Sequence, residues 1–118
     1  MTTKSKGDAA EDKALYMLEQ KGMQCLERQF RTESGEIDLI MRDTEAAVVV
    51  FVEVRSGDSR IFPAYQESIT AVKIRKITQV AMAFLDNYTG EYEFLRLDAV
   101  FVEKNGETVH LENIAILP

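Results

Sequence analysis

The sequence predicts an α/β fold in which a mixed central sheet of about five strands is flanked by helices. The strongest strand signal is the run Val-Val-Val-Phe-Val-Glu-Val over 48–54, which is typical of a strand covered on both faces. A long amphipathic helical pattern separates this run from the next strand, and a helix that links two strands of one sheet makes them parallel. We therefore expect the order helix, strand, strand, strand, helix, strand, strand.

The first element is a helix predicted over 8–21. Asp8 followed three residues later by Glu11 resembles a capping box, apolar residues then recur at helical spacing, and Gly22 offers a stop. The polar residues 1–6 in front of this helix are expected to be a flexible N-terminus.

Three strands follow this helix. Mixed apolar and polar residues over 23–31 predict a short strand, which turns at Ser34-Gly35. The next strand covers 36–41, and it is expected to lie beside the strand over 48–54 at the centre of the sheet. Side-chain alternation puts Ile37, Leu39 and Met41 on one face of the second strand and Glu36, Asp38 and Ile40 on the other.

The second half of the chain predicts a loop, a helix and a hairpin. The loop covers 56–65, and Thr70 is placed to cap the helix that follows. The apolar stripe of this helix consists of Ile74, Ile77, Ala81, Phe84, Leu85 and Tyr88. A strand over 94–102 and one over 108–111 flank Asn105-Gly106, which is a signal for a type I′ hairpin turn.

Composition limits the classes of function. The chain of 118 residues has no visible linker, so a single domain over 1–118 is expected. No signal peptide and no run of about 18 apolar residues is present, which predicts a cytoplasmic protein without a membrane span. Because Cys25 and His110 are the only residues of their types, an internal disulfide and a thiolate zinc cluster are excluded, and Ser-His-Asp or Cys-His catalysis has little support. The net charge of −6 works against long-range attraction to nucleic acid.

Two carboxylates lie in the predicted central hairpin. A symmetric turn over 43–47 places Asp38 opposite Glu53. The same register places Glu36 opposite Arg55, on the face that Glu53 occupies. Facing carboxylates about 5 Å apart at Cβ repel each other, and burying one unpaired costs several kcal/mol, so the pair implies a compensating cation, a shared proton or a shifted pKa. Mg²⁺ suits this position because it is a hard cation that takes oxygen ligands, often only one or two carboxylates.

The same residues also allow a structural interpretation. Glu36 would then pair with Arg55, while Glu53 would bind a backbone amide or Arg96. The role of Glu11 is undecided as well. Helical spacing puts it on the apolar stripe that faces the sheet, where it could reach a metal, whereas the capping box explains this glutamate without any ligand. Spacing alone does not decide between a metal site and a ladder of ion pairs.

Basic residues near the start of the second helix are candidates for phosphate contacts. Lys73, Arg75 and Lys76 lie where side chains and a helix N-terminus can bind phosphate together, although a solvated helix face also explains them. With Arg55 and Arg60 they form a patch that can hold DNA weakly and with strong salt dependence.

The remaining polar candidates favour structural roles. Asp98 lies two residues from Arg96 in a predicted strand and is interpreted as part of a surface or structural ion pair. His110 is interpreted as a packing residue rather than a ligand, and Cys25 as a small buried hydrophobe.

Several short motifs follow one another along nearly the whole chain. They are Gly7 with Ala10-Glu11 and Leu18, Lys21-Gly22, Gly35-Glu36-Ile37-Asp38-Leu39-Ile40, Phe51-Val52-Glu53-Val54-Arg55, Thr70 with Lys73, Arg96-Leu97-Asp98, and Glu112-Asn113-Ile114-Ala115. In these motifs the chain resembles the YraN-like proteins, a bacterial family assigned to the PD-(D/E)xK, or restriction-endonuclease-like, superfamily and similar to Holliday-junction resolvases. The Gly-Glu-Ile-Asp block followed by Phe-Val-Glu-Val is the most specific part of the match.

The resemblance implies a restriction-endonuclease-like core and a metal-dependent nuclease that acts on phosphodiester bonds of branched or abnormal DNA. Carried over by position, Glu11, Asp38 and Glu53 would hold Mg²⁺ or Mn²⁺, which favours a ligand role for Glu11 over the capping box. Arg55 completes the catalytic set and would stabilise charge on the phosphate, since arginine cannot give up its proton near neutral pH. Resolvase-like enzymes often act as dimers, so the same analogy suggests a homodimer.

A second function is open beside the nuclease. A nuclease fold that no longer cuts, and that binds nucleic acid or a protein partner, is favoured by the negative net charge. Ser56-Gly57-Asp58 also favours it, because relatives often carry a further basic residue in this segment. Arg60 could partly replace the missing phosphate contact.

Overall fold

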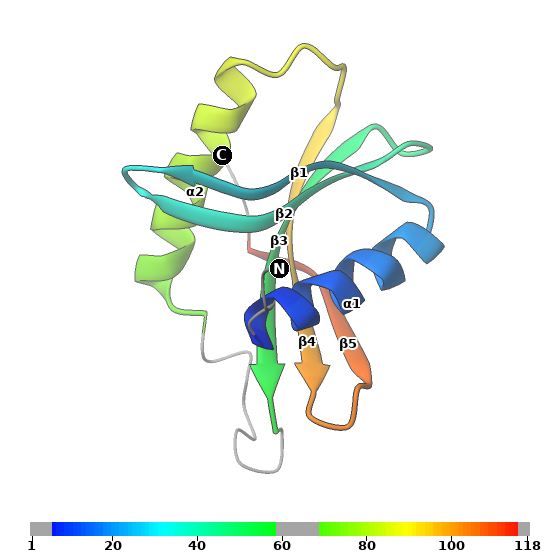
Figure 1. The fold of residues 1–118 in the computed structure, drawn as a ribbon. Coiled ribbons are helices and arrows are strands. Elements are labelled where there is room, and N and C mark those ends of the chain that lie inside the picture. The colour runs from blue at the N-terminus through cyan, green and yellow to red at the C-terminus, as the bar shows by residue number, and fades with distance from the viewer. Residues whose placement is uncertain (1–5, 59–68, 116–118) are drawn as a thin grey trace, which may run out of the picture.

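The computed structural model (Figure 1) describes residues 6–58 and 69–115 and has the predicted order of elements. The elements are α1 (Lys6–Gln20), β1 (Met23–Thr32), β2 (Gly35–Asp43), β3 (Val48–Gly57), α2 (Ala71–Asp86), β4 (Phe94–Glu103) and β5 (Thr108–Ala115). The α/β class and the predicted sequence of helices and strands are confirmed.

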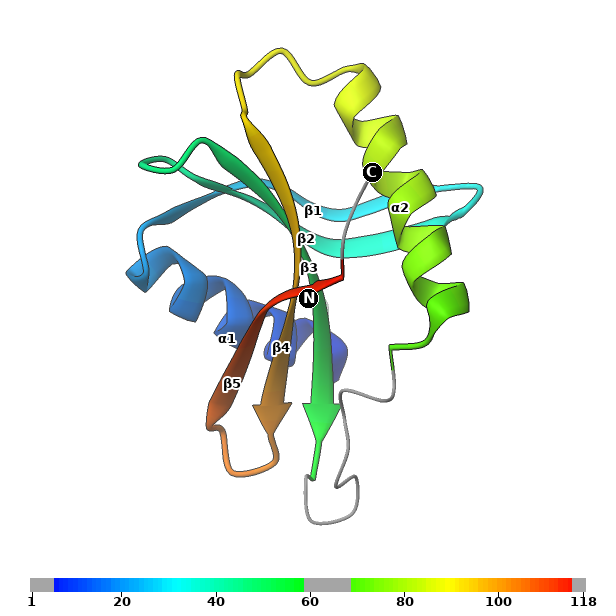
Figure 2. The ribbon, with the colours of Figure 1, turned by 180° about the vertical axis from the view of Figure 1, so that it is seen from behind.

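The strands form one mixed sheet in the order β1-β2-β3-β4-β5. β3 and β4 run parallel because α2 carries the chain back across the sheet, and the other neighbouring pairs are antiparallel. Figures 1 and 2 show α1 and α2 on opposite faces of the sheet. β3 is therefore central and covered on both faces, as its apolar run predicts.

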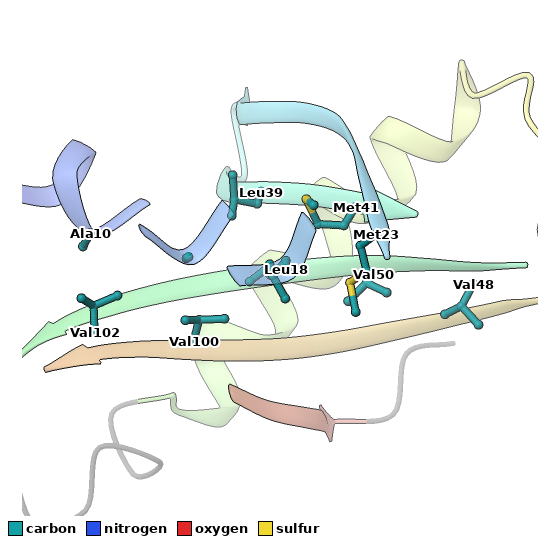
Figure 3. Close-up of a cluster of buried hydrophobic side chains, with 11 residues drawn as sticks. Ala10, Leu18, Met23, Leu39, Met41, Val48, Val50, Val100 and Val102 are labelled. Atoms are coloured by element: carbon teal, nitrogen blue, oxygen red, sulfur yellow. The ribbon is translucent and has the colours of Figure 1, made fainter. Parts of the chain in front are cut away.

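Each helix covers its own hydrophobic cluster. On the α1 face, Leu18 lies over Val50 of β3 and Val100 of β4 (Figure 3). On the α2 face, Phe51 of β3 and Val80 of α2 belong to the second cluster. Full burial of a side chain of this size contributes roughly 1.5 to 3 kcal/mol, so the two clusters hold β2 and β3 firmly in the middle layer.

The hairpin of β2 and β3 has the predicted register. Leu39 lies opposite Val52 and Asp43 opposite Val48, so the next pair along the hairpin is Asp38 and Glu53. Regular pairing ends at Leu39 and Val52. The two carboxylates therefore lie just beyond the last paired residues of the two strands.

The predicted alternation of side chains in β2 is wrong at one place. Leu39 joins the α1 cluster, whereas Ile37 joins the α2 cluster, although both were expected on one face. The reason lies in β1, where Gln29 has the left-handed backbone angle φ 50°. Because Arg28 pairs with Leu39 and the ladder resumes two residues later, Gln29 lies opposite Asp38 and interrupts the regular pleat there.

α1 begins earlier than predicted. Its first residue is Lys6, so Asp8 lies inside the helix and cannot be its N-cap. The predicted capping box of Asp8 and Glu11 is therefore wrong. At the start of α2, in contrast, Thr70 is the N-cap as predicted, and its side chain accepts the N–H of Lys73.

Some predictions lie outside the described residues. These are the flexible N-terminus, apart from Lys6, and residues 59–65 of the predicted loop, which include Arg60. Within the described residues, no helix has the length and apolar character needed to cross a membrane.

The hairpin of β4 and β5 is confirmed, but its predicted turn type is wrong. A type I′ turn needs positive φ at both central residues, and at Asn105-Gly106 only Gly106 has it, with φ 95°. The turn instead closes with the Gly106 N–H donating to the Glu103 carbonyl at 2.9 Å. β5 also runs on to Ala115, four residues further than predicted.

Candidate functional site

Asp38 lies where β2 and β3 stop pairing. In place of a further backbone bond, its Oδ2 accepts the N–H of Val54 at 2.7 Å. The side chain thus reaches across to β3 at the strand end. Glu53 is the residue directly before Val54, so the hairpin register brings both carboxylates to one region, as the sequence predicts.

Glu53 is a buried carboxylate that contacts two cationic side chains of the described residues. Only 5% of the residue is exposed, and its Oε1 lies 2.8 Å from Lys73 Nζ and 3.5 Å from Arg55 Nη2. The structural alternative paired Glu53 with a backbone amide or with Arg96. The part of this alternative that involves Arg96 is wrong, because Arg96 instead binds Asp98.

The pKa of Asp38 is raised from 3.8 to about 7. Burial is the main cause, followed by the charge of Glu53, and the hydrogen bond from Val54 opposes the rise. The charges of Glu11 and Glu36 raise this pKa further. Among residues 6–58 and 69–115 no basic side chain forms an ion pair with Asp38, so its strongest electrostatic neighbours are other carboxylates.

Glu11 reaches this region from α1. It is 4% exposed, and its carboxylate accepts hydrogen bonds from Arg28 Nε at 3.0 Å and Gln29 Nε2 at 3.2 Å. The contacts explain why the capping-box interpretation fails, since the side chain is turned toward β1. This buried carboxylate therefore lies close enough to Asp38 to raise its pKa.

A cleft opens at the site on the side of α2. Its volume is about 580 Å³, within the usual range for ligand sites. It is lined by Gly35, Glu36, Asp38, Glu53, Val54, Arg55, Thr70, Val72, Lys73, Lys76 and Ile77. Arg55 also has a buried Nε donor that finds no hydrogen-bond acceptor among the described residues. Acidic and basic groups therefore face the same space.

The other predicted residues divide between the cleft and its surroundings. Lys76 lines the cleft, whereas Arg75 is exposed on α2 and does not. Glu36 lines the cleft too, but it forms an ion pair with Arg31 at 3.3 Å rather than with Arg55. The predicted cross-strand pair of Glu36 and Arg55 is therefore wrong, because the strands have already separated at this point.

Sequence reasoning missed two residues of the site. Arg28 pairs with Glu11 and also with Asp12, at 2.7 Å, which fixes α1 against β1. Gln29 donates to Glu11 from a left-handed backbone conformation that costs a residue with a side chain of order 1 kcal/mol or more. The role of Gln29 could not be predicted from the sequence, because no local sequence pattern indicates that a glutamine has a positive φ angle.

A second polar cluster lies away from the cleft, around Asp98. This residue is fully buried, so the surface part of the earlier interpretation is wrong and the structural ion pair is confirmed. Arg96 Nε and Nη2 donate to its two oxygens at 2.8 and 2.9 Å, and Asn113 N donates at 2.9 Å. His110 Nε2 lies 2.7 Å from Asp98 Oδ2 while its Nδ1 lies 2.8 Å from Lys21 Nζ.

The geometry of this cluster favours structure over metal binding. Asp98, His110 and Glu112 offer ligand atoms within 4.8 Å of one another. However, both oxygens of Asp98 and both ring nitrogens of His110 already have protein partners. Burial alone would raise the pKa of Asp98, but the hydrogen bonds from His110, Arg96 and Asn113 outweigh it and lower that pKa. The cluster ties the end of α1 to β4 and β5.

Cys25 is only partly buried. Its Sγ lies 3.6 Å from the carbonyl oxygen of Glu27, and burial is the main cause of a raised thiol pKa. A raised pKa keeps the thiol protonated and unreactive, which agrees with a packing role.

Comparisons with known proteins agree on one group. Residues 10–102 match the model of a family described as "Uncharacterised protein family UPF0102". A UPF0102 protein of Nitrosomonas eutropha is 38% identical over 112 residues, which is 95% of this chain and 94% of the relative. One of Nitrosomonas europaea is 40% identical and covers 92% of each chain. One of Sulfurihydrogenibium sp. is 37% identical over 96% of each.

Proposed function

The chain belongs to the uncharacterised family UPF0102, and from that starting point we propose that it is a Mg²⁺- or Mn²⁺-dependent nuclease acting on branched or otherwise abnormal DNA. One observation carries the proposal. Asp38 and Glu53 lie where β2 and β3 stop pairing, and they line a cleft together with Arg55 and Lys73. This arrangement offers oxygen ligands to a cation and positive groups to a phosphate.

The residues present fit a divalent cation of this type. The donors are carboxylate oxygens, which suit hard cations, and the described cleft contains no histidine or cysteine that would favour a softer metal. The raised pKa of Asp38 supports the same conclusion, because carboxylates crowded together are stabilised by a cation. Among the described residues the Nε donor of Arg55 has no hydrogen-bond acceptor, which supports an anion beside this side chain.

The chain's own residues have separate parts in this proposal. Asp38 and Glu53 would hold the cation. Both oxygens of Glu11 already accept hydrogen bonds, from Arg28 and Gln29, so Glu11 would act from beside the cation's ligands by orienting water. A bound divalent cation supplies an activated water and neutralises charge on the phosphate. Arg55 stabilises the negative charge that develops during attack, as a fixed positive group in a partly buried site.

The proposed substrate contact extends along α2. Lys76 lies at the mouth of the cleft one turn after Lys73, where it can meet the nucleic-acid backbone. Because the net charge is −6, binding is expected to be weak and strongly dependent on salt. Cutting two strands of a junction requires two sites, so the proposal includes a homodimer.

Cleavage assays test this proposal. The full chain is incubated with labelled junction, flap and single-stranded DNA in Mg²⁺ or Mn²⁺, and Asp38→Ala and Glu53→Ala are expected to lower the cleavage rate at least about 100-fold, because the ligands of the cation are lost. Asp86→Ala, at an exposed position at the end of α2, is the matched control and should cleave like the wild type. Equal cleavage by wild type and both site variants, or no cleavage of any substrate, would contradict the proposal.

A binding module that no longer cuts is the second candidate. It is favoured by Gly57, which occupies a place where a nuclease of this kind would gain from another phosphate contact. This candidate predicts salt-sensitive DNA binding without any response to Mn²⁺. Calorimetric titration of the same protein with Mn²⁺ and with DNA separates the two functions.

A further inference from the structure

Lys73 occupies an unfavourable place for a positive charge. It lies in the first turn of α2, where the helix dipole favours anions, and that turn contains no acidic residue. Thr70 caps the helix by accepting the N–H of Lys73, so the backbone position of the lysine is fixed. The local cost indicates that the charge is compensated elsewhere, and the structure shows where.

The compensating group is Glu53. The distance from Lys73 Nζ to Glu53 Oε1 is 2.8 Å, shorter than the 3.5 Å from Arg55 Nη2 to the same oxygen. The carboxylate is nearly buried, whereas a third of the lysine side chain is exposed to the cleft. Among the described residues, Lys73 thus provides the closest positive charge to Glu53, one of the two proposed metal ligands.

The two cations differ in their freedom to move. The ammonium of Lys73 is a compact charge on a flexible stem that enters from α2, so small rotations can carry it within the cleft. Arg55 is a planar group rooted in β3, and its Nε is already buried. Lys73 can therefore leave Glu53 and still face the same space.

We propose that the Lys73 ammonium is an exchangeable cation of the nuclease site: it pairs with Glu53 in the metal-free protein and turns to a phosphate oxygen of the nucleic acid when a divalent cation binds that carboxylate. This inference rests on the proposed function, and it makes Lys73 a catalytic residue that touches substrate. The proposal also explains why the Lys73 ammonium points toward Glu53.

Two binding measurements test the exchange without relying on cleavage. Calorimetry gives the affinity for Mn²⁺ alone and then the affinity of the Mn²⁺-loaded protein for inorganic phosphate. Lys73→Met is expected to bind Mn²⁺ about 3- to 10-fold more tightly, because a competing charge is gone, and phosphate about 10-fold more weakly. Lys73→Gln should change both affinities in the same directions, so the test does not depend on the folding of a single variant. Lys104→Met, in the exposed turn after β4, is the control and should change both affinities less than about 2-fold.

The opposite signs of the two shifts are the signature of exchange. A lysine that only supports the fold would weaken both affinities when replaced, and a solvated surface lysine would change neither, so either result overturns the inference. Opposite shifts in a protein that cleaves no DNA would uphold the exchange and contradict the nuclease. Absence of Mn²⁺ binding by the wild type contradicts the metal site itself and the exchange together.

Discussion

Asp38→Asn is expected to make the metal-free protein more stable at pH 8 by roughly 2 kcal/mol, although it removes a proposed metal ligand. The pKa of Asp38 rises from 3.8 to about 7 on folding, so between these values the folded chain binds more protons than the unfolded one. Its stability therefore falls as the pH rises through this window and stays low above it. Asparagine carries no charge and keeps an oxygen for the Val54 N–H.

Urea unfolding in the presence of a chelator measures this effect. Between pH 4 and pH 8 the asparagine variant should lose less stability than the wild type, and the difference between the two should be largest at pH 8. Asp86→Asn, an exposed aspartate at the end of α2, is the control and should follow the wild type. An Asp38→Asn protein that is less stable than the wild type at pH 8 would show that the carboxylate is not under electrostatic strain.

Asp98→Ala is expected to destabilise the fold by about 3 to 5 kcal/mol, the usual effect of breaking a buried ion pair by removing one partner. The carboxylate is fully buried, and its loss leaves Arg96 and His110 without their common acceptor. Because the pKa of Asp98 is lowered on folding, its contribution is present above pH 3.8 and is lost as the pH falls through the folded pKa.

Thermal or urea unfolding at neutral pH checks this prediction. Glu112→Ala is the matched control, since Glu112 lies 3.7 Å from the same Arg96 but its side chain is 57% exposed, and its loss should cost less than about 1 kcal/mol. At temperatures where Asp98→Ala remains folded, its Mn²⁺ affinity should equal that of the wild type, because the cluster lies outside the cleft. Equal stability of the two variants would contradict the structural role of Asp98.

The features that follow from periodicity along the chain could be predicted. The apolar run of β3 and the helical pattern that Thr70 caps predict the central strand and the parallel crossover. A symmetric turn between β2 and β3 predicts the register that brings Asp38 to Glu53. These features depend on the spacing of residues along the chain, which the sequence gives directly. The metal and the nuclease activity stay predictions.

The features that depend on side chains meeting through the fold could not be predicted. Lys73 contacts Glu53 because α2 packs beside β3. Neither the helical spacing nor the strand pattern predicts the distance between these two side chains. The left-handed Gln29 breaks the pleat that alternation assumes. Asp98 was expected in an ion pair, but its full burial depends on donors from β5 that lie far along the chain.

Binding of Mn²⁺ to the metal-free protein tests the central claim most directly. Calorimetric titration at pH 7.5 should show binding by the wild type that weakens at least about 30-fold in both Asp38→Asn and Glu53→Gln, because each variant removes one charged oxygen ligand. Glu112→Gln, away from the cleft, should bind Mn²⁺ like the wild type. A wild type that binds no Mn²⁺, or site variants that bind it as tightly as the control, would contradict a metal site between Asp38 and Glu53.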